Sequence, residues 1–189
     1  MKGTNMLEPD FDVMWREKIL LKIEGGSFLC KSIYEGETLL FNNVDGRLND
    51  IYADYRYFKT GRFMYWHIEL IDNENGNTYV ICFSYTSAMF QSIILRLATA
   101  TSFENIQITP YQDKGGKDYQ RREHSKVKVS ADGVELQMLP FKLPKIDCFR
   151  VGTQVRKNYA QRIASIAKII DTILRQVKNA STRARGQMA

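Results

Sequence analysis

The chain has 189 residues, of which 44% are hydrophobic and 25% charged, and its net charge is +6. These values exclude a disordered or fibrous protein and predict one globular domain with an extension. Its three cysteines, Cys30, Cys82 and Cys148, lie far apart, which argues against a disulfide framework and favours a cytoplasmic location. The first residues lack an apolar signal segment and no stretch has the length of a membrane span, so we expect no membrane partner.

The N-terminal part predicts a β-hairpin and a short third strand. Residues 18–23 and 28–34 are apolar runs on either side of Gly25-Gly26, a pair that supplies the positive φ values of a tight turn. Residues 38–44 form another apolar run. It ends at Asp45-Gly46, which predicts a turn into the next strand.

A three-stranded meander is predicted between residues 48 and 85. Residues 48–57, 63–71 and 78–85 alternate in polarity, and polar turns separate them. The apolar face carries Ile51, Ala53, Tyr55, Tyr57, Met64, Trp66, Ile68 and Leu70. The outward face carries Tyr52, Arg56, Phe58, Lys59, Arg62, Phe63, Tyr65 and His67.

A helix is predicted after the meander, because the apolar period changes to about 3.6 residues between Ser87, a reasonable N-cap, and Thr101. A strand at 105–111, a polar loop at 112–126 and a hairpin at 127–138 follow. Pro140 and Pro144 then end the domain, since proline cannot donate to a sheet. We place this domain at residues 1–150 and a basic extension at 151–189.

The extension predicts one amphipathic helix. Residues 156–189 carry a charge of +7, which leaves about −1 for the rest of the chain. The apolar stripe fits packing on the domain, and it equally fits a coiled coil that makes a homo-oligomer. The stripe comprises Val155, Tyr159, Ile163, Ile166, Ile170, Ile173 and Val177.

The order of three strands, a helix and a strand is typical of a small OB barrel, a fold that binds nucleic acids. The fold class that we expect is therefore mainly β (α+β). It would be an OB-like five-stranded barrel with one internal helix, an added N-terminal hairpin and a long C-terminal amphipathic helix.

Sequence-independent binding of single strands needs cations for the phosphates and exposed aromatic faces for the bases. The outward face of the meander and the 112–126 loop supply both. The alternative is ordinary sheet packing of the aromatic residues and a solvated loop that also carries three acids. The candidate nucleic-acid-binding residues are Arg56, Lys59, Arg62, Phe63, Tyr65, His67, Lys114, Lys117, Tyr119, Arg121 and Arg122.

Enzymatic activity has little support in the sequence. The two histidines, His67 and His124, have no metal-ligand spacing, and no phosphate-binding, dinucleotide-binding or nucleophile-elbow motif is present. We expect no cofactor and no catalytic residue. A metal-binding cluster of Asp50, Asp54, Glu69 and Asp72 is a weaker alternative to ordinary turn and edge-strand acids.

The segments 66–72 (WHIELID) and 76–85 (GNTYVICFSY), with Ile94-Leu-Arg-Leu97 and the strand 106–111 before its Gly-Gly-Lys117 loop, resemble bacteriophage single-stranded DNA-binding proteins of the OB-fold type. The resemblance covers about residues 45–138 and is one of pattern. It implies coating of single-stranded DNA in phage replication or recombination, within the bacterial cytoplasm. It also implies that Arg62, Phe63, Tyr65, Lys117 and Tyr119 lie on the binding surface.

One departure from that family concerns the C-terminus, since many such proteins end in an acidic tail that recruits partners. This chain has no acid after Asp171 and carries Lys178, Arg183 and Arg185. The basic tail could bind DNA, join protomers or dock on an acidic protein. The function that we expect is sequence-independent binding of single-stranded DNA, with RNA left open. The alternative is a phage structural or interaction module that oligomerises through its C-terminal helix.

Overall fold

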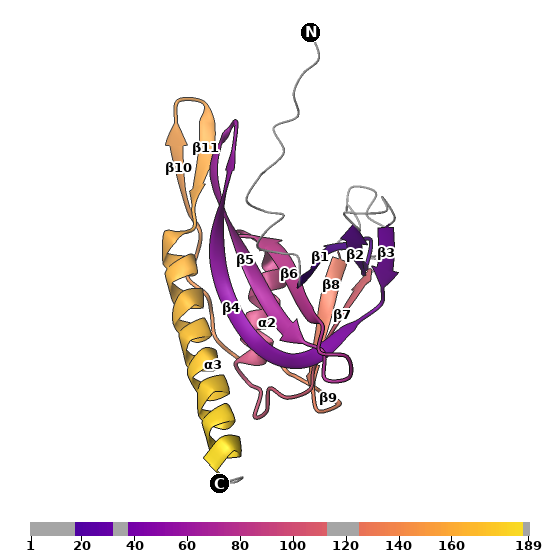
Figure 1. Ribbon diagram of the computed structural model, residues 1–189. Coiled ribbons are helices and arrows are strands. Elements are labelled where there is room, and N and C mark those ends of the chain that lie inside the picture. The colour runs from indigo at the N-terminus through magenta and orange to yellow at the C-terminus, as the bar shows by residue number, and fades with distance from the viewer. Residues whose placement is uncertain (1–17, 32–37, 113–124, 187–189) are drawn as a thin grey trace.

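The computed structural model describes residues 18–31, 38–112 and 125–186. Within these ranges the protein is mainly β and has two helices (Figure 1). Nine of the strands form one sheet and two form a separate ribbon. The elements are β1 (Lys18–Glu24), β2 (Ser27–Lys31), β3 (Thr38–Phe41), β4 (Val44–Phe58), β5 (Gly61–Ile71), β6 (Thr78–Ser84), α2 (Ala88–Leu97), β7 (Ile106–Gln112), β8 (Ser125–Ala131), β9 (Val134–Glu135), β10 (Asp147–Val151), β11 (Gln154–Asn158) and α3 (Ala160–Gly186).

The predicted meander forms the centre of the large sheet. β4, β5 and β6 are antiparallel neighbours, and Ile51, Ile68 and Ile81 lie opposite one another across them. Residues that are directly opposite share a face of the sheet. All three isoleucines are at most 3% exposed, so this part of the predicted apolar face is core. Ala53, Tyr55 and Tyr57 on the same face of β4 are exposed, so in this strand the predicted burial is confirmed only as far as Ile51.

The sheet is open. After α2 the chain returns as β7, which pairs with the first residues of β4, and β8 pairs with β7. The free edge of β6 is taken by β1, which runs parallel to it with Leu20 opposite Val80. The strand order is β3-β2-β1-β6-β5-β4-β7-β8-β9, so the predicted closed barrel of five strands is not confirmed.

The β1–β2 turn brings the two halves of this sheet close together. Gly26 has a φ of +79°, as the predicted Gly25-Gly26 turn requires. Its N–H donates to the Ser125 hydroxyl of β8 at 3.2 Å. A Cβ at Gly26 would lie 2.7 Å from the backbone nitrogen of Gln112 in β7. A side chain at this position would therefore separate the N-terminal hairpin from β7 and β8.

Gly46 corrects the prediction of a turn at Asp45-Gly46. The residue lies inside β4, opposite Ile106 of β7. A Cβ built on it would stand 2.4 Å from the carbonyl oxygen of Ile71. Glycine is required here because another stretch of backbone passes too close for a side chain, and the sequence alone cannot distinguish this use of glycine from a turn.

The core lies between the sheet and the two helices. Ser87 caps α2, since its hydroxyl accepts a hydrogen bond from the Phe90 N–H at 3.2 Å. The Phe90 ring stacks on Trp66 of β5 with 5.1 Å between the ring centroids. Ile93, Ile94 and Leu97 of the same helix are fully buried. The helix, its cap and its buried face are therefore confirmed, although α2 ends at Leu97 and not at Thr101.

The C-terminal helix begins later than predicted. Residues 147–158 form the β10–β11 ribbon, whose turn contains Gly152 at a φ of +61°. Val155 lies in β11 and is 59% exposed, so it does not belong to the helical stripe. The prediction was wrong because the apolar spacing continues by coincidence across a strand. The glycine turn was the local signal against a helix there.

The isoleucine stripe of α3 packs on the protein's own core. Ile166, Ile170 and Ile173 are 1%, 5% and 0% exposed, and Ile163 and Val177 are half-buried against the same cluster. Of the two interpretations of the stripe, packing on the domain is the one that the structure shows. The boundary placed after Arg150 falls within β10, and α3 shares its core with the preceding domain.

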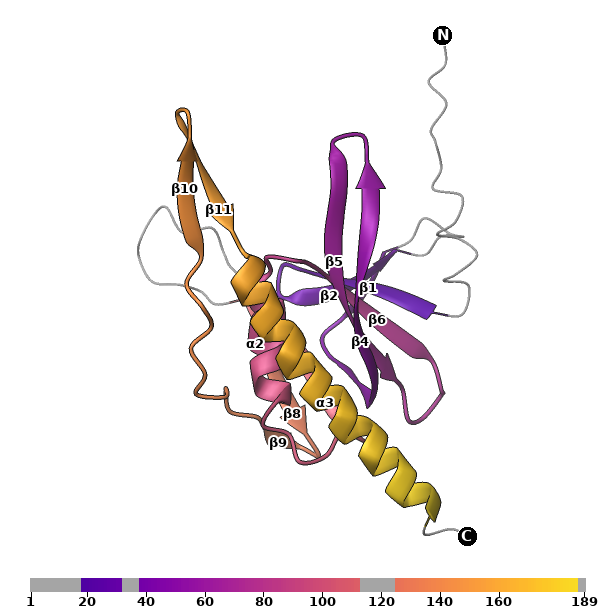
Figure 2. The ribbon, with the colours of Figure 1, turned by 90° about the vertical axis from the view of Figure 1, so that its left-hand side faces the viewer.

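Two ribbons extend beyond this core. One is the distal half of the β4–β5 hairpin, and the other is β10–β11 (Figure 1). Figure 2 shows that they project in the same direction and stand apart from each other. The C-terminal end of α3 lies at the opposite end of the molecule in both views.

Candidate nucleic-acid interface

The end of the β4–β5 hairpin concentrates the exposed aromatic residues of the meander. We define residues 55–65 as the β4–β5 tip. It contains five aromatic residues, three basic residues and no acid. Tyr57 is 73% exposed, and Tyr55, Phe58 and Phe63 are 46%, 45% and 40% exposed. Large aromatic side chains usually bury most of their surface, so this exposure needs a functional explanation.

One face of the tip is formed by Tyr55, Tyr57, Arg62 and Met64. Tyr57 lies opposite Arg62, and Tyr55 lies opposite Met64. The Arg62 guanidinium carbon is 3.6 Å from the centroid of the Tyr55 ring and 5.6 Å from that of Tyr57. One cation therefore contacts two exposed rings, a geometry in which the ring quadrupole attracts the charge.

The other face repeats this composition. Arg56 lies opposite Phe63, and its guanidinium carbon is 4.8 Å from the centroid of the Tyr65 ring. The Phe58 ring centroid is 5.7 Å from that of Phe63 and 6.5 Å from that of Tyr65. Both faces of the tip therefore present aromatic rings beside a guanidinium group.

The exposure of the tip follows from the length of the two strands. β4 has 15 residues and β5 has 11, so their alternation continues past the part of the sheet that faces the core. Trp66 on the core face is 5% exposed, whereas Tyr57 on the same face is 73% exposed. Since the two strands are paired all the way to Phe58 and Gly61, the tip is an ordered ribbon and not an irregular loop.

The structure brings five of the predicted binding residues together and separates a sixth. Arg56, Lys59, Arg62, Phe63 and Tyr65 all belong to the tip, although Arg62 shares the face of Tyr55 and Tyr57, not the face predicted for it. His67 is fully buried, which excludes it from contact with a base. The remaining predicted residues, Lys114, Lys117, Tyr119, Arg121 and Arg122, lie outside the described residues.

Sequence reasoning missed Tyr55 and Tyr57 as candidates, because the same alternation that marks Ile51 as core extends to them. The signal that could have found them is the basic, acid-free turn that follows. A strand that continues into such a turn extends beyond the core, so the last residues of its apolar face become exposed to solvent.

His67 belongs to a buried cluster on the outward face of the meander. Its ring stacks on Tyr52 at 4.9 Å, and its Nδ1 lies 3.1 Å from the Cys82 sulfur. Burial lowers the pKa of His67 to about 4, with a further contribution from the Arg56 charge, and burial raises the pKa of Cys82 to about 11. Both groups are therefore neutral near pH 7. A reactive cysteine needs a thiolate, so this pair is not an activated nucleophile.

The acids that might have formed a metal cluster have separate roles. Glu69 is 5% exposed and accepts hydrogen bonds from Lys18 and Asn49, each at 2.6 Å. Asp72 accepts from the backbone of Glu74 at 2.8 Å, which lowers the pKa of its carboxyl group. Among the residues that the structure describes, no group of three His, Cys, Asp or Glu side chains is placed to hold a metal ion.

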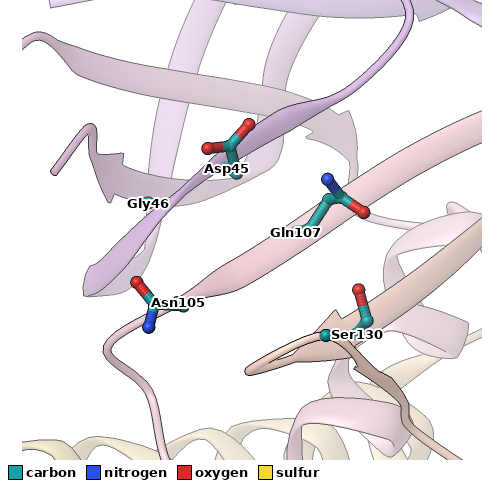
Figure 3. A pocket seen from close by; sticks show the side chains of 6 residues that line it. Asp45, Gly46, Asn105, Gln107 and Ser130 are labelled. Carbon is teal, nitrogen blue, oxygen red and sulfur yellow. The ribbon is translucent and has the colours of Figure 1, made fainter. Parts of the chain in front are cut away.

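A depression of about 190 Å³ lies away from the tip, where β4, β7 and β8 meet (Figure 3). Asp45, Asn105, Gln107 and Ser130 line it with polar side chains, and two glycines complete it. Sites for cofactors and other small molecules are usually larger, about 300–1,000 Å³, and mainly apolar. We therefore place the candidate site on the exposed tip and not in this depression.

In the described ranges, neither helix combines the length and the apolar character of a transmembrane segment.

No protein-family model matches the chain, and no curated protein and no solved structure shows significant similarity to it.

Proposed function

We propose that this protein binds single-stranded DNA without sequence preference, and that the β4–β5 tip is its principal binding site. The observation that carries the proposal is the composition of the tip, with five aromatic residues and three cations in 11 residues and no acid. Cations attract the phosphate backbone, and every base has a face that can stack on an exposed ring. Neither interaction depends on base identity.

The proposed fold is a variant of the OB domain. In this proposal β4, β5, β6, α2, β7 and β8 are the OB elements in their usual chain order, and β1 occupies the edge of β6 that the fifth OB strand would pair with. The tip is then the connection between the first two strands, which OB domains use for binding. Binding that does not depend on base identity fits a role in DNA replication or recombination, as the resemblance to phage proteins implies.

The alternative, an interaction module that oligomerises through α3, has less support. Ile166, Ile170 and Ile173 are already buried within one copy of the chain. The basic tail also contributes little to this proposal, since α3 ends on the side of the molecule away from the tip (Figure 2).

The proposal is tested by fluorescence anisotropy with the full chain and a labelled poly-dT strand of about 20 nucleotides, longer than the sites of about 4–16 nucleotides that OB domains cover. A duplex of equal length and a poly-U strand serve as competitors. We expect tight binding to the single strand that weakens steeply with salt, because counterions are released from the phosphates. Equal affinity for the duplex would overturn the proposal, and preference for poly-U would reassign the substrate to RNA.

Two sets of substitutions separate stacking from charge. Y57A/F58A/F63A removes three rings and keeps every charge, and we expect a loss of about 1–3 kcal/mol per stacked base. K59A/R62A keeps all five aromatic residues, and we expect a smaller dependence of affinity on salt. The matched controls are F141A, at a position 46% exposed outside the tip, and R175A, on the exposed side of α3. If the controls weaken binding as much as the tip variants do, the tip is not the site.

A further inference from the structure

The β10–β11 ribbon has no structural reason to be as apolar and basic as it is. All ten of its strand residues are exposed, including Phe149 at 49%, Val151 at 48% and Val155 at 59%. A two-stranded ribbon without a core is only marginally stable in water. Residues 147–158 carry three cations, Arg150, Arg156 and Lys157, against the single acid Asp147.

The cross-strand pairs of this ribbon repeat those of the β4–β5 tip. Phe149 lies opposite Arg156, and Arg150 lies opposite Val155. In the tip, Phe63 lies opposite Arg56 and Tyr57 lies opposite Arg62. Each ribbon therefore places a guanidinium group beside an apolar side chain. That arrangement places a group that can bind phosphate next to an apolar surface against which a base can pack.

Tyr85 connects the ends of the two ribbons that lie nearest the core. The Tyr85 N–H donates to the carbonyl oxygen of Met64 in β5 at 3.2 Å. Its ring meets that of Tyr159, which directly follows β11, with 6.0 Å between the ring centroids. Arg162 at the start of α3 donates to the carbonyl oxygen of Pro144, just before β10, at 2.9 Å. The end of the β10–β11 ribbon that joins the core is thereby held beside Met64, at the inner end of the β4–β5 tip, and both ribbons project in one direction (Figure 2).

We propose that the β10–β11 ribbon is a second contact for the same nucleic-acid strand, so that the strand is held by the ribbon and the β4–β5 tip together. This inference rests on the proposed function. The ligand of the ribbon is a single-stranded nucleic acid, because the positive charge of the ribbon complements phosphate and Phe149 offers a ring for stacking.

The test compares R150A/R156A/K157A and F149A with the wild-type full chain. All four positions are exposed, so the melting temperature should stay near that of wild type. We expect the triple variant to reduce the slope of log affinity against log salt by about 2, since each phosphate contact on a single strand contributes about 0.7. F149A should weaken binding about fivefold or more without changing that slope. R175A should change neither quantity.

The affinity for poly-dT strands of increasing length is a second measurement, and a general loss of positive charge would not change how affinity depends on length. Wild-type affinity should keep rising until the strand reaches both ribbons, whereas the triple variant should stop improving at a shorter length. A fluorophore on the exposed Cys148 should also change its emission when single-stranded DNA binds.

The outcomes distinguish the two proposals. If the tip variants lose binding but the ribbon variants match wild type in affinity, salt slope and length dependence, the second contact is wrong and the proposed function stands. If the wild-type chain does not bind single strands, both fail. If the ribbon variants instead change the mass of the protein in sedimentation and leave DNA binding unchanged, the ribbon holds a second copy of the chain and the inference is overturned.

Discussion

The guanidinium group of Arg62 lies against the ring of Tyr55, with 3.6 Å between the guanidinium carbon and the ring centroid. Tyr55 and Arg62 come from opposite strands of the β4–β5 hairpin and share one of its faces. The contact favours, without any ligand, an arrangement in which an exposed tyrosine and an exposed arginine lie side by side. Pre-organisation of this kind reduces the loss of side-chain entropy on binding.

Replacing Arg62 by lysine should separate the stacking role of the guanidinium group from its charge. Lysine keeps the charge but lacks the planar group that lies on Tyr55. In salt titrations followed by anisotropy, we expect R62K to bind single-stranded DNA several-fold more weakly with an unchanged salt slope. R62A should bind more weakly still, with a slope reduced by about 0.7. Identical behaviour of R62K and wild type would show that only charge matters at this position.

The substitution Gly46→Ala should destabilise the fold, because the new methyl group would stand 2.4 Å from the Ile71 carbonyl oxygen. Since the neighbours are backbone atoms, the strands must separate to make room. We expect a loss of about 2 kcal/mol or more in the free energy of unfolding, measured by urea denaturation. Gly76→Ala is the control. It adds a methyl group in open space at a φ of +72°, and it should cost about 1 kcal/mol.

Ile173→Ala should reveal that the stripe of α3 belongs to the core of a single chain. Ile173 is fully buried, and truncating such a residue costs about 2–5 kcal/mol. The exposed control R175A should cost less than about 0.5 kcal/mol. Thermal melts at several protein concentrations provide the measurement. A melting temperature that rises with wild-type concentration, and loses this dependence in I173A, would favour the oligomeric alternative.

His67 should make the stability of the protein depend on pH between about 6.5 and 4. The pKa of His67 falls from 6.5 to about 4 on folding, so in this range the unfolded chain binds a proton that the folded chain does not. Stability therefore decreases as the pH falls through this window, by up to about 3 kcal/mol, and the contribution levels off below about pH 4. The difference between wild type and H67Q in urea denaturation should follow this curve. A constant difference across the window would contradict the assignment.

Cysteine reactivity should differ between Cys148 and Cys82. Cys148 is exposed in β10, whereas Cys82 is half-buried and its pKa is raised to about 11 by burial. Because the thiolate is the reactive form, a thiol-specific reagent at pH 8 should label Cys148 first. Mass spectrometry of partly labelled protein provides the measurement. Labelling of Cys82 before Cys148 would show that the meander opens readily.

Local sequence signals were sufficient for most of the elements. Polarity alternation predicted the meander of β4, β5 and β6, and Ser87 together with a 3.6-residue period predicted α2 and its cap. The Gly25-Gly26 pair predicted the first hairpin. These succeed because turns, caps and periodicity depend on residues that are near one another in the chain.

Other features depended on contacts between distant residues, which only the tertiary structure decided. β1 pairs in parallel with β6, 60 residues further along, and thereby leaves the sheet open. His67 is buried on a face that looks solvent-facing in the sequence, whereas Tyr55 and Tyr57 are exposed on the face that looks like core. The alternation of a strand determines which residues share a side. What covers that side, and where the cover ends, depends on the rest of the fold.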